Sequence, residues 1–129
     1  MRTELLTYLK DQKFKNFNVS DELPFSSSNT VLYQKNPKRI YADVEQVTLE
    51  PLIQTFGTPI DAEVHSVRLY FTTDAKQLPS DYSNVVSQIK AGKGVSTDEK
   101  FFRRECTTAT SFENDLMITE FEFRFTKLT

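Results

Sequence analysis

The chain has 129 residues, of which 38% are hydrophobic and 26% charged, and its formal net charge is −2. This length predicts one folded domain over residues 1–129, and the slightly acidic balance argues against nucleic-acid binding through a basic surface. Because Cys106 and His65 are its single cysteine and histidine, an internal disulfide and a structural zinc site made of these residue types are excluded. No apolar run is long enough for a transmembrane helix or the core of a signal peptide, so we expect assembly in the cytoplasm.

The first part of the chain predicts a helix, a loop and a strand. Residues 2–13 carry apolar side chains at helical spacing, namely Leu5, Leu6, Tyr8 and Leu9. Thr3 is the expected N-cap of this helix. Residues 20–29 contain one proline and three consecutive serines, which is typical of a loop. The following segment, residues 30–35, predicts a strand.

Residues 39–49 alternate between apolar and polar side chains, but the apolar positions change parity near Glu45. This defect indicates either a one-residue bulge within one strand or two shorter strands. Residues 50–61 hold two prolines and one glycine, so we expect a long loop. Three apolar side chains in that loop either fold back onto the core or protrude to bind a partner: Leu52, Ile53 and Phe56.

The second half predicts a central strand, a helix and another strand. Residues 63–73 alternate and carry apolar groups on both sides, which favours a central position in a sheet. From Leu78 to Ile89 the apolar residues follow helical spacing, with Ser80 as the expected N-cap and Gly92 as the stop. Residues 101–112 predict the next strand, and the polar run that follows it is typical of a hairpin turn.

The clearest strand signal is the period of two over residues 117–125. One face of this closing strand carries three phenylalanines, Phe121, Phe123 and Phe125. The other face is mostly charged, with Glu120, Glu122 and Arg124. Together these elements predict a single α+β domain, a mostly antiparallel sheet with two helices packed on one face.

Motifs of catalysis, phosphate binding and metal binding are absent from the sequence, which predicts no catalytic residue, cofactor or metal. Gly92-Lys93-Gly94 superficially resembles a phosphate loop but follows a helix instead of a strand. His65 is open to interpretation as a general base, although its apolar strand favours a packed or hydrogen-bonded sheet residue. Cys106 would need His65 beside it to act as a nucleophile, and a small buried hydrophobic role is favoured.

Two charged pairs have both a functional and a structural interpretation. Arg103 and Arg104 can bind a phosphate or a partner carboxylate, but consecutive strand residues point to opposite faces, which favours separate cross-strand pairs. Asp43 and Glu45 share one face and can act as an acid–base pair, although a solvated edge is the favoured interpretation.

In layout and hydrophobic pattern, most of the chain resembles the tail terminator proteins of long-tailed bacteriophages, the minor tail protein family exemplified by that of phage lambda. The resemblance lies in the initial amphipathic helix and in the strand EVHSVRLYF with the helix over residues 80–91 after it. It continues in the tetrapeptide FRRE at residues 102–105 and in the closing strand LMITEFEFRF. The segment over residues 50–61 departs from the family pattern.

The resemblance implies a non-enzymatic virion protein that caps the finished tail tube as a hexameric ring and forms the surface that joins the head. Its partners would be further copies of itself, the tail tube protein and a head-completion or connector protein. DNA would pass through the lumen without sequence-specific binding, and no membrane is involved. We expect interface residues among Leu52, Ile53, Phe56, Arg103, Arg104, Glu120 and Glu122. Two alternatives remain: another head–tail connector, neck or baseplate adaptor, and a small enzyme that uses His65 and Cys106.

Overall fold

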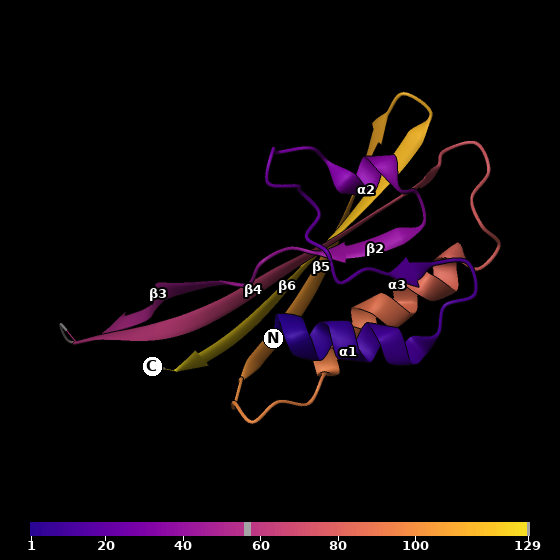
Figure 1. Ribbon diagram of the computed structural model, residues 1–129. Helices are drawn as coiled ribbons and strands as arrows, with labels where there is room; N and C mark the ends of the chain where they lie inside the picture. Colours follow the sequence, from indigo (N-terminus) through magenta and orange to yellow (C-terminus); the bar gives the residue numbers. More distant parts are fainter. Residues whose placement is uncertain (56–57, 129) are drawn as a thin grey trace.

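The computed structural model describes residues 1–55 and 58–128, with side chains for all of these except residues 52–55, 58 and 59. Within these residues, a six-stranded sheet has the order β1-β2-β4-β6-β5, and β3 also pairs with β4 (Figure 1). The strands are β1 (Asn18–Val19), β2 (Arg39–Ala42), β3 (Gln46–Thr55), β4 (Thr58–Asp74), β5 (Arg103–Glu113) and β6 (Leu116–Leu128). The helices are α1 (Arg2–Gln12), α2 (Leu32–Lys35) and α3 (Tyr82–Lys90), which continues into the 3-10 turn η1 (Ala91–Gly94).

β4 is the central strand, as the sequence predicts. It pairs with β6 along most of its length, from Ala62 with Leu128 to Asp74 with Leu116. On its other side β3 pairs with the first part of β4 and β2 with a later part, where Tyr41 lies opposite Tyr70. All pairings are antiparallel except β1 with β2, so the α+β prediction is confirmed.

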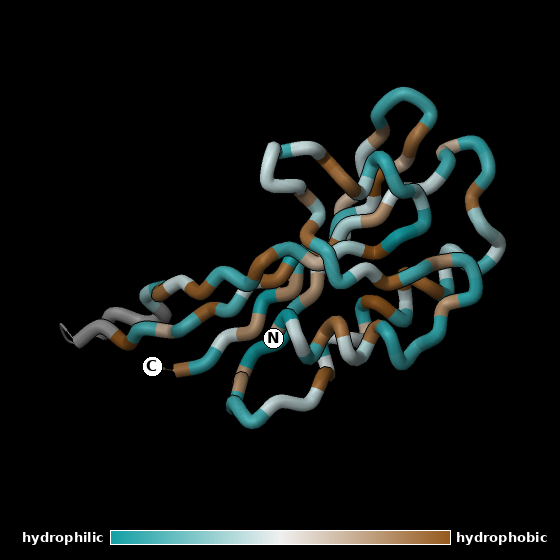
Figure 2. Tube along the Cα trace, in the orientation of Figure 1, coloured by the Kyte–Doolittle hydropathy of each residue, from teal (hydrophilic) through white to brown (hydrophobic). Residues whose placement is uncertain are grey.

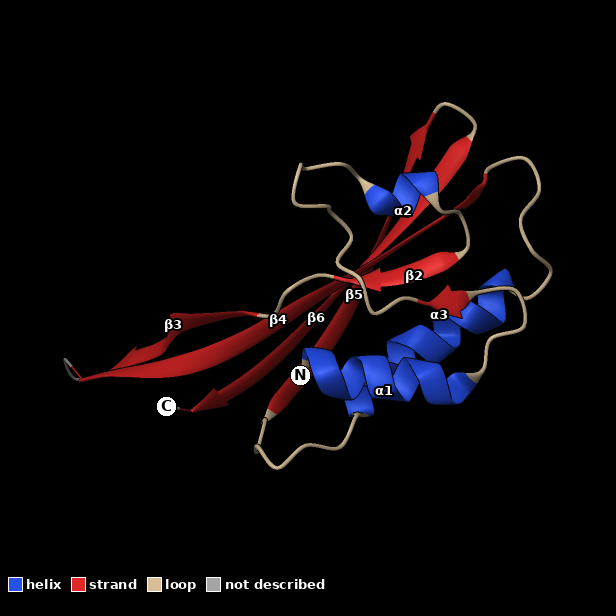
Figure 3. Cartoon of the chain, in the orientation of Figure 1, coloured by secondary structure: helices blue, strands red, loops and turns tan. Residues whose placement is uncertain are grey.

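The main core lies between one face of the sheet and the helices α1 and α3 (Figure 3). Leu5 and Leu9 of α1 and Ile89 of α3 are fully buried against this face. The sheet contributes the phenylalanines of the closing strand, where the rings of Phe123 and Phe125 stack with centroids 6.2 Å apart. Because all three of these phenylalanines are fully buried, the predicted inward face of residues 117–125 and the two-helix layer are confirmed.

The short helix α2 covers the opposite face of the sheet. The ring of Tyr33 stacks on that of Tyr70 at 4.9 Å, and Phe25 meets both rings edge-on. The strand predicted for residues 30–35 is therefore wrong, apart from an isolated bridge between Val31 and Phe25. The physical reason is that β2 occupies the place beside β4, so this segment finds no strand to pair with.

Residues 39–49 form parts of two strands, β2 and β3, so of the two interpretations the shorter strands are confirmed. The long loop predicted for residues 50–61 is wrong, because β3 runs on to Thr55 and β4 begins at Thr58. Proline is tolerated in an edge strand, where an N–H on the open side has no partner to lose, and the register shifts between Pro51 and Ile53. Leu52 and Ile53 therefore lie in β3, whereas Phe56 falls outside the described residues.

Helix ends differ from the sequence prediction more than helix bodies do. Met1, not Thr3, is the N-cap of α1, and no side chain caps it. α3 begins at Tyr82 after Asp81, so Ser80 is not its N-cap.

The predicted hairpin turn is confirmed between β5 and β6, where Asn114 takes a positive φ of 57°. None of the helices in the described part of the chain is long and apolar enough to cross a membrane.

Candidate functional site

β3 and the part of β4 that pairs with it, residues 58–66, form a hairpin that we call the arm. The arm extends away from α1 and α3 (Figure 1), and apolar residues follow it beyond the helices (Figure 2). Val47 and Leu49 lie opposite His65 and Glu63, so they share the face that the helices cover farther along the sheet. They are 52% and 66% exposed, respectively, which makes the arm an apolar surface without a cover in the described chain.

The two long outer strands of the sheet, β3 and β5, are both open on one side in the described part of the chain. β5 is paired with β6 without a register shift from Arg103 to Glu113, and it contains no proline. A long regular edge of this kind presents a row of backbone N–H and C=O groups that another strand can pair with. β3 presents a second edge of this type before the irregularity at Pro51.

The sheet face opposite α1 and α3 carries a lattice of charged side chains. Arg68 of β4 lies between Glu120 and Glu122 of β6, with nitrogen–oxygen distances of 3.8 and 3.5 Å. Arg124 donates hydrogen bonds of 2.9 and 3.0 Å to both carboxylate oxygens of Glu50. The side chains of these pairs are between 32% and 52% exposed, so water screens each pair and its contribution to stability is small. Their charges are available to a partner surface.

The two neighbouring arginines of β5 point to opposite faces, as the sequence predicts. Arg103 pairs with Glu105 at 3.1 Å on the charged face. Arg104 donates hydrogen bonds to the carbonyl groups of Lys93 and Val95 at 3.0 and 2.8 Å. Its guanidinium also lies 5.8 Å from the ring centre of Phe101. Arg104 therefore ties η1 to the sheet, which is a structural contact within the chain.

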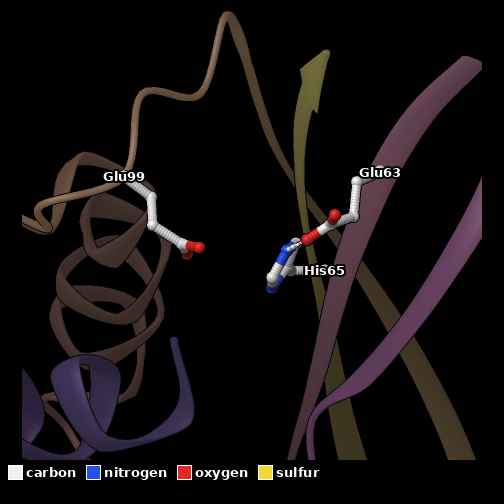
Figure 4. Close-up of side chains that lie close together, drawn as sticks. All are labelled: Glu63, His65 and Glu99. Atoms are coloured by element: carbon white, nitrogen blue, oxygen red, sulfur yellow. Dashed lines mark hydrogen bonds and ion pairs between the residues drawn. The ribbon is translucent and has the colours of Figure 1, made fainter. Parts of the chain in front are cut away.

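His65 is the centre of a charged cluster at the base of the arm (Figure 4). The imidazole is buried, with 6% of the residue exposed. Its Nδ1 atom lies 3.2 Å from Oε2 of Glu45, and its Nε2 atom lies 2.6 Å from Oε1 of Glu63. The sequence correctly predicts a hydrogen-bonded sheet histidine. It does not reveal the partners, although the spacing of Glu63 and His65 on one strand face is a visible signal.

Two further charged residues complete this cluster. Glu99 reaches it from the loop between η1 and β5, and Lys127 reaches it from β6. The Nζ atom of Lys127 lies 2.6 Å from Oε1 of Glu99 and 3.5 Å from Oε1 of Glu63. Hydrogen bonding from His65, with support from Lys127, holds the pKa of Glu63 below its usual value. Glu63 is therefore ionised at neutral pH.

Glu45 does not pair with Asp43, so the acid–base interpretation of these two residues, which the sequence disfavoured, is wrong. Glu45 lies between β2 and β3 and turns toward His65 and the amino group of Met1, which is 2.5 Å from its Oε1 atom. Burial alone would raise the pKa of Glu45, but the hydrogen bonds from Met1 and His65 outweigh it and lower the pKa. Asp43 instead accepts a hydrogen bond from the backbone N–H of Val44.

Cys106 is half-buried in β5 and packs against the core. Burial raises its pKa to about 11, so the thiol stays protonated at neutral pH.

Gly92 is buried in η1, where an added Cβ atom would lie 3.1 Å from Cδ2 of Leu5. The glycine is therefore needed for close packing of η1 on α1, which explains it without a phosphate.

No protein-family model matches the chain, and no curated protein matches it either.

Proposed function

We propose that this protein is a phage assembly protein of the tail terminator type, which caps the completed tail tube as a ring, most simply a hexamer. In this role it ends polymerisation of the tube and provides the surface that joins the head. The observation that carries the proposal is the pair of open sheet edges, β3 and β5, at opposite sides of one sheet. Contacts between two different surfaces are the kind that generate rings.

The geometry supports this contact because an exposed edge of one copy can pair with the other edge of the next copy. The exposed side chains of Val47 and Leu49 on β3 would then be covered, which removes apolar surface from water. Leu52 and Ile53 belong to β3, and they stay predicted interface residues together with Phe56, which lies outside the described residues. Such a contact closes a ring when the rotation between successive copies completes a full turn, and it yields an open filament when the rotation does not close.

The charged face suits the wall of a channel for DNA. Glu120 and Glu122 face one arginine, Arg68, so this part of the face carries excess negative charge. A surface of this sign repels phosphate and lets DNA slide past without sequence-specific binding. The tail tube protein and a head-completion protein would meet the two rims of the ring.

The test replaces Leu49 with aspartate and measures the oligomeric state by light scattering and the capping of tail tubes by electron microscopy. We expect L49D to keep its fold but to lose both ring formation and capping, because a charge on the covered edge must be desolvated. L78D is the matched control, since Leu78 is 46% exposed in a loop outside both edges.

Wild-type protein that stays monomeric at high concentration and is also inert toward tail tubes would contradict the proposal. Binding to a head-completion protein without binding to tubes would instead identify a head–tail connector. Charge reversal at Glu120 or Glu122 tests the charged face separately. We expect the rings to persist if that face lines the channel and to dissociate if it is a subunit contact.

A further inference from the structure

The cluster around His65 has the donor set of a metal site. One ring nitrogen of His65 and one carboxylate oxygen each from Glu63 and Glu99 all lie within 4.8 Å of one another. Figure 4 shows Glu63 and His65 on β4, and Glu99 approaching from the loop on the other side. One imidazole and two carboxylates form a mixed nitrogen–oxygen set that suits zinc and similar divalent transition metals.

The imidazole is held in the orientation that a metal ligand requires. In this structure Nε2 shares its hydrogen bond with Glu63 at 2.6 Å, whereas Glu45 lies 3.2 Å from Nδ1. A metal that replaced the Nε2–Glu63 hydrogen bond would leave the ring proton on Nδ1, where it is donated to Glu45, and Nε2 would be the ligand atom. The ring is further fixed by Phe101, whose ring meets it edge-on with centroids 5.3 Å apart. A carboxylate behind a histidine is the usual second layer of a protein zinc site.

In this structure the ammonium group of Lys127 lies where a metal cation would bind between Glu63 and Glu99. Its Nζ atom bridges Glu63 and Glu99, which together carry two negative charges against one positive charge. A divalent cation would balance both carboxylates if Lys127 turned outward. Its side chain is 22% exposed and sits near the end of β6, so it has a path to solvent. Both carboxylates need a side-chain rotation to close the site, because ligand atoms on a tetrahedral zinc lie about 3.4 Å apart. Glu99 has to approach, and Glu63, whose Oε1 atom lies 2.6 Å from Nε2 of His65, has to draw back.

We propose that Glu63, His65 and Glu99 bind a divalent transition-metal cation, which displaces the ammonium group of Lys127 and leaves a further coordination position for water. The metal would link the loop before β5 to the base of the arm. It would therefore stabilise the folded state by mass action. This inference does not depend on the tail terminator role, because it concerns binding to the isolated chain.

The test is titration of tag-free protein with Zn²⁺ in a calorimeter, together with the visible absorption of bound Co²⁺. We expect one saturable site. The E99Q variant removes a ligand at a 41% exposed side chain, so the fold is preserved and binding should weaken more than tenfold. E105Q is the matched control, since Glu105 is an exposed glutamate of the neighbouring strand that pairs with Arg103. Its affinity should equal that of the wild type.

The K127M variant separates a metal site from a purely structural ion-pair cluster. Removing the competing ammonium group should tighten Zn²⁺ binding by about tenfold. The H65Q variant should abolish the Co²⁺ bands in the visible spectrum while circular dichroism reports on its fold. Failure of the wild type to saturate, equal affinity of E99Q and wild type, or weaker binding by K127M would each overturn the proposal.

Discussion

Replacement of Phe121 by alanine tests whether the stability of the domain resides in the aromatic layer between β6 and the helices. Phe121 is fully buried, and its ring stacks on that of Phe71 with centroids 6.0 Å apart. Phe71 in turn meets Phe17 edge-on at 5.1 Å, so the cavity would open at one end of a buried aromatic row. A buried phenylalanine replaced by alanine costs about 3–5 kcal/mol, and we expect about 4 kcal/mol here.

The magnitude is large against the total stability of a domain, which is about 5–15 kcal/mol. We expect the midpoint of thermal unfolding to fall by roughly 15 °C for a chain of this length. F112A is the matched control, because Phe112 of the neighbouring strand is 67% exposed and should change stability by about 0.5 kcal/mol or less.

The assay is urea unfolding followed by circular dichroism, since the chain has no tryptophan. The slope of the free energy of unfolding against urea should be the same in both variants. The reasoning fails if F121A loses less than about 1 kcal/mol, or if F112A is as destabilising as F121A.

Three further predictions concern individual contacts. In urea unfolding, R104M should lose about 1–3 kcal/mol of unfolding free energy, because the carbonyl groups of Lys93 and Val95 lose a charged donor. R103M should lose about 0.5 kcal/mol or less, because it removes only an exposed ion pair. The pKa of Glu45 is lower in the folded state than its usual value of about 4.5, so its ionised form stabilises the fold above that pH, and this stabilisation is lost as the pH falls below it. E45Q should therefore flatten the acid branch of a plot of unfolding free energy against pH. An unchanged acid branch would contradict this. Cys106 should react slowly with a thiol reagent at pH 7 in native protein and rapidly in urea, given a pKa of about 11; equal rates would show that it is not protected.

Local patterns in the sequence determined the elements that have a strong period of their own. The alternation over residues 117–125 predicts β6 and its buried face, and the apolar stripe of residues 2–13 predicts α1. Such patterns succeed because a strand or helix on a core must repeat its apolar residues at the period of its own backbone. For the same reason the opposite orientation of Arg103 and Arg104 follows from the sequence.

Local sequence patterns do not show which strands pair with one another. The two wrong predictions, for residues 30–35 and 50–61, both depend on strand pairing. Residues 30–35 have strand-forming side chains, but β2 already pairs with the neighbouring part of β4. Residues 50–61 contain prolines that predict a loop, but an edge strand tolerates a missing N–H on its open side. Whether a segment forms a strand therefore depends on which other segments lie beside it in the folded chain.

The sequence by itself determined the fold class and the buried face of the closing strand, because both follow from short-range periodicity. Only the tertiary structure decided the charged cluster around His65, whose partners Glu45, Glu99 and Lys127 come from three other parts of the chain. Side chains so far apart in sequence meet only when antiparallel pairing of β4 with β6 and packing of the loop before β5 bring them together. The same pairing leaves the edges of β3 and β5 open, and these edges carry the proposed assembly function.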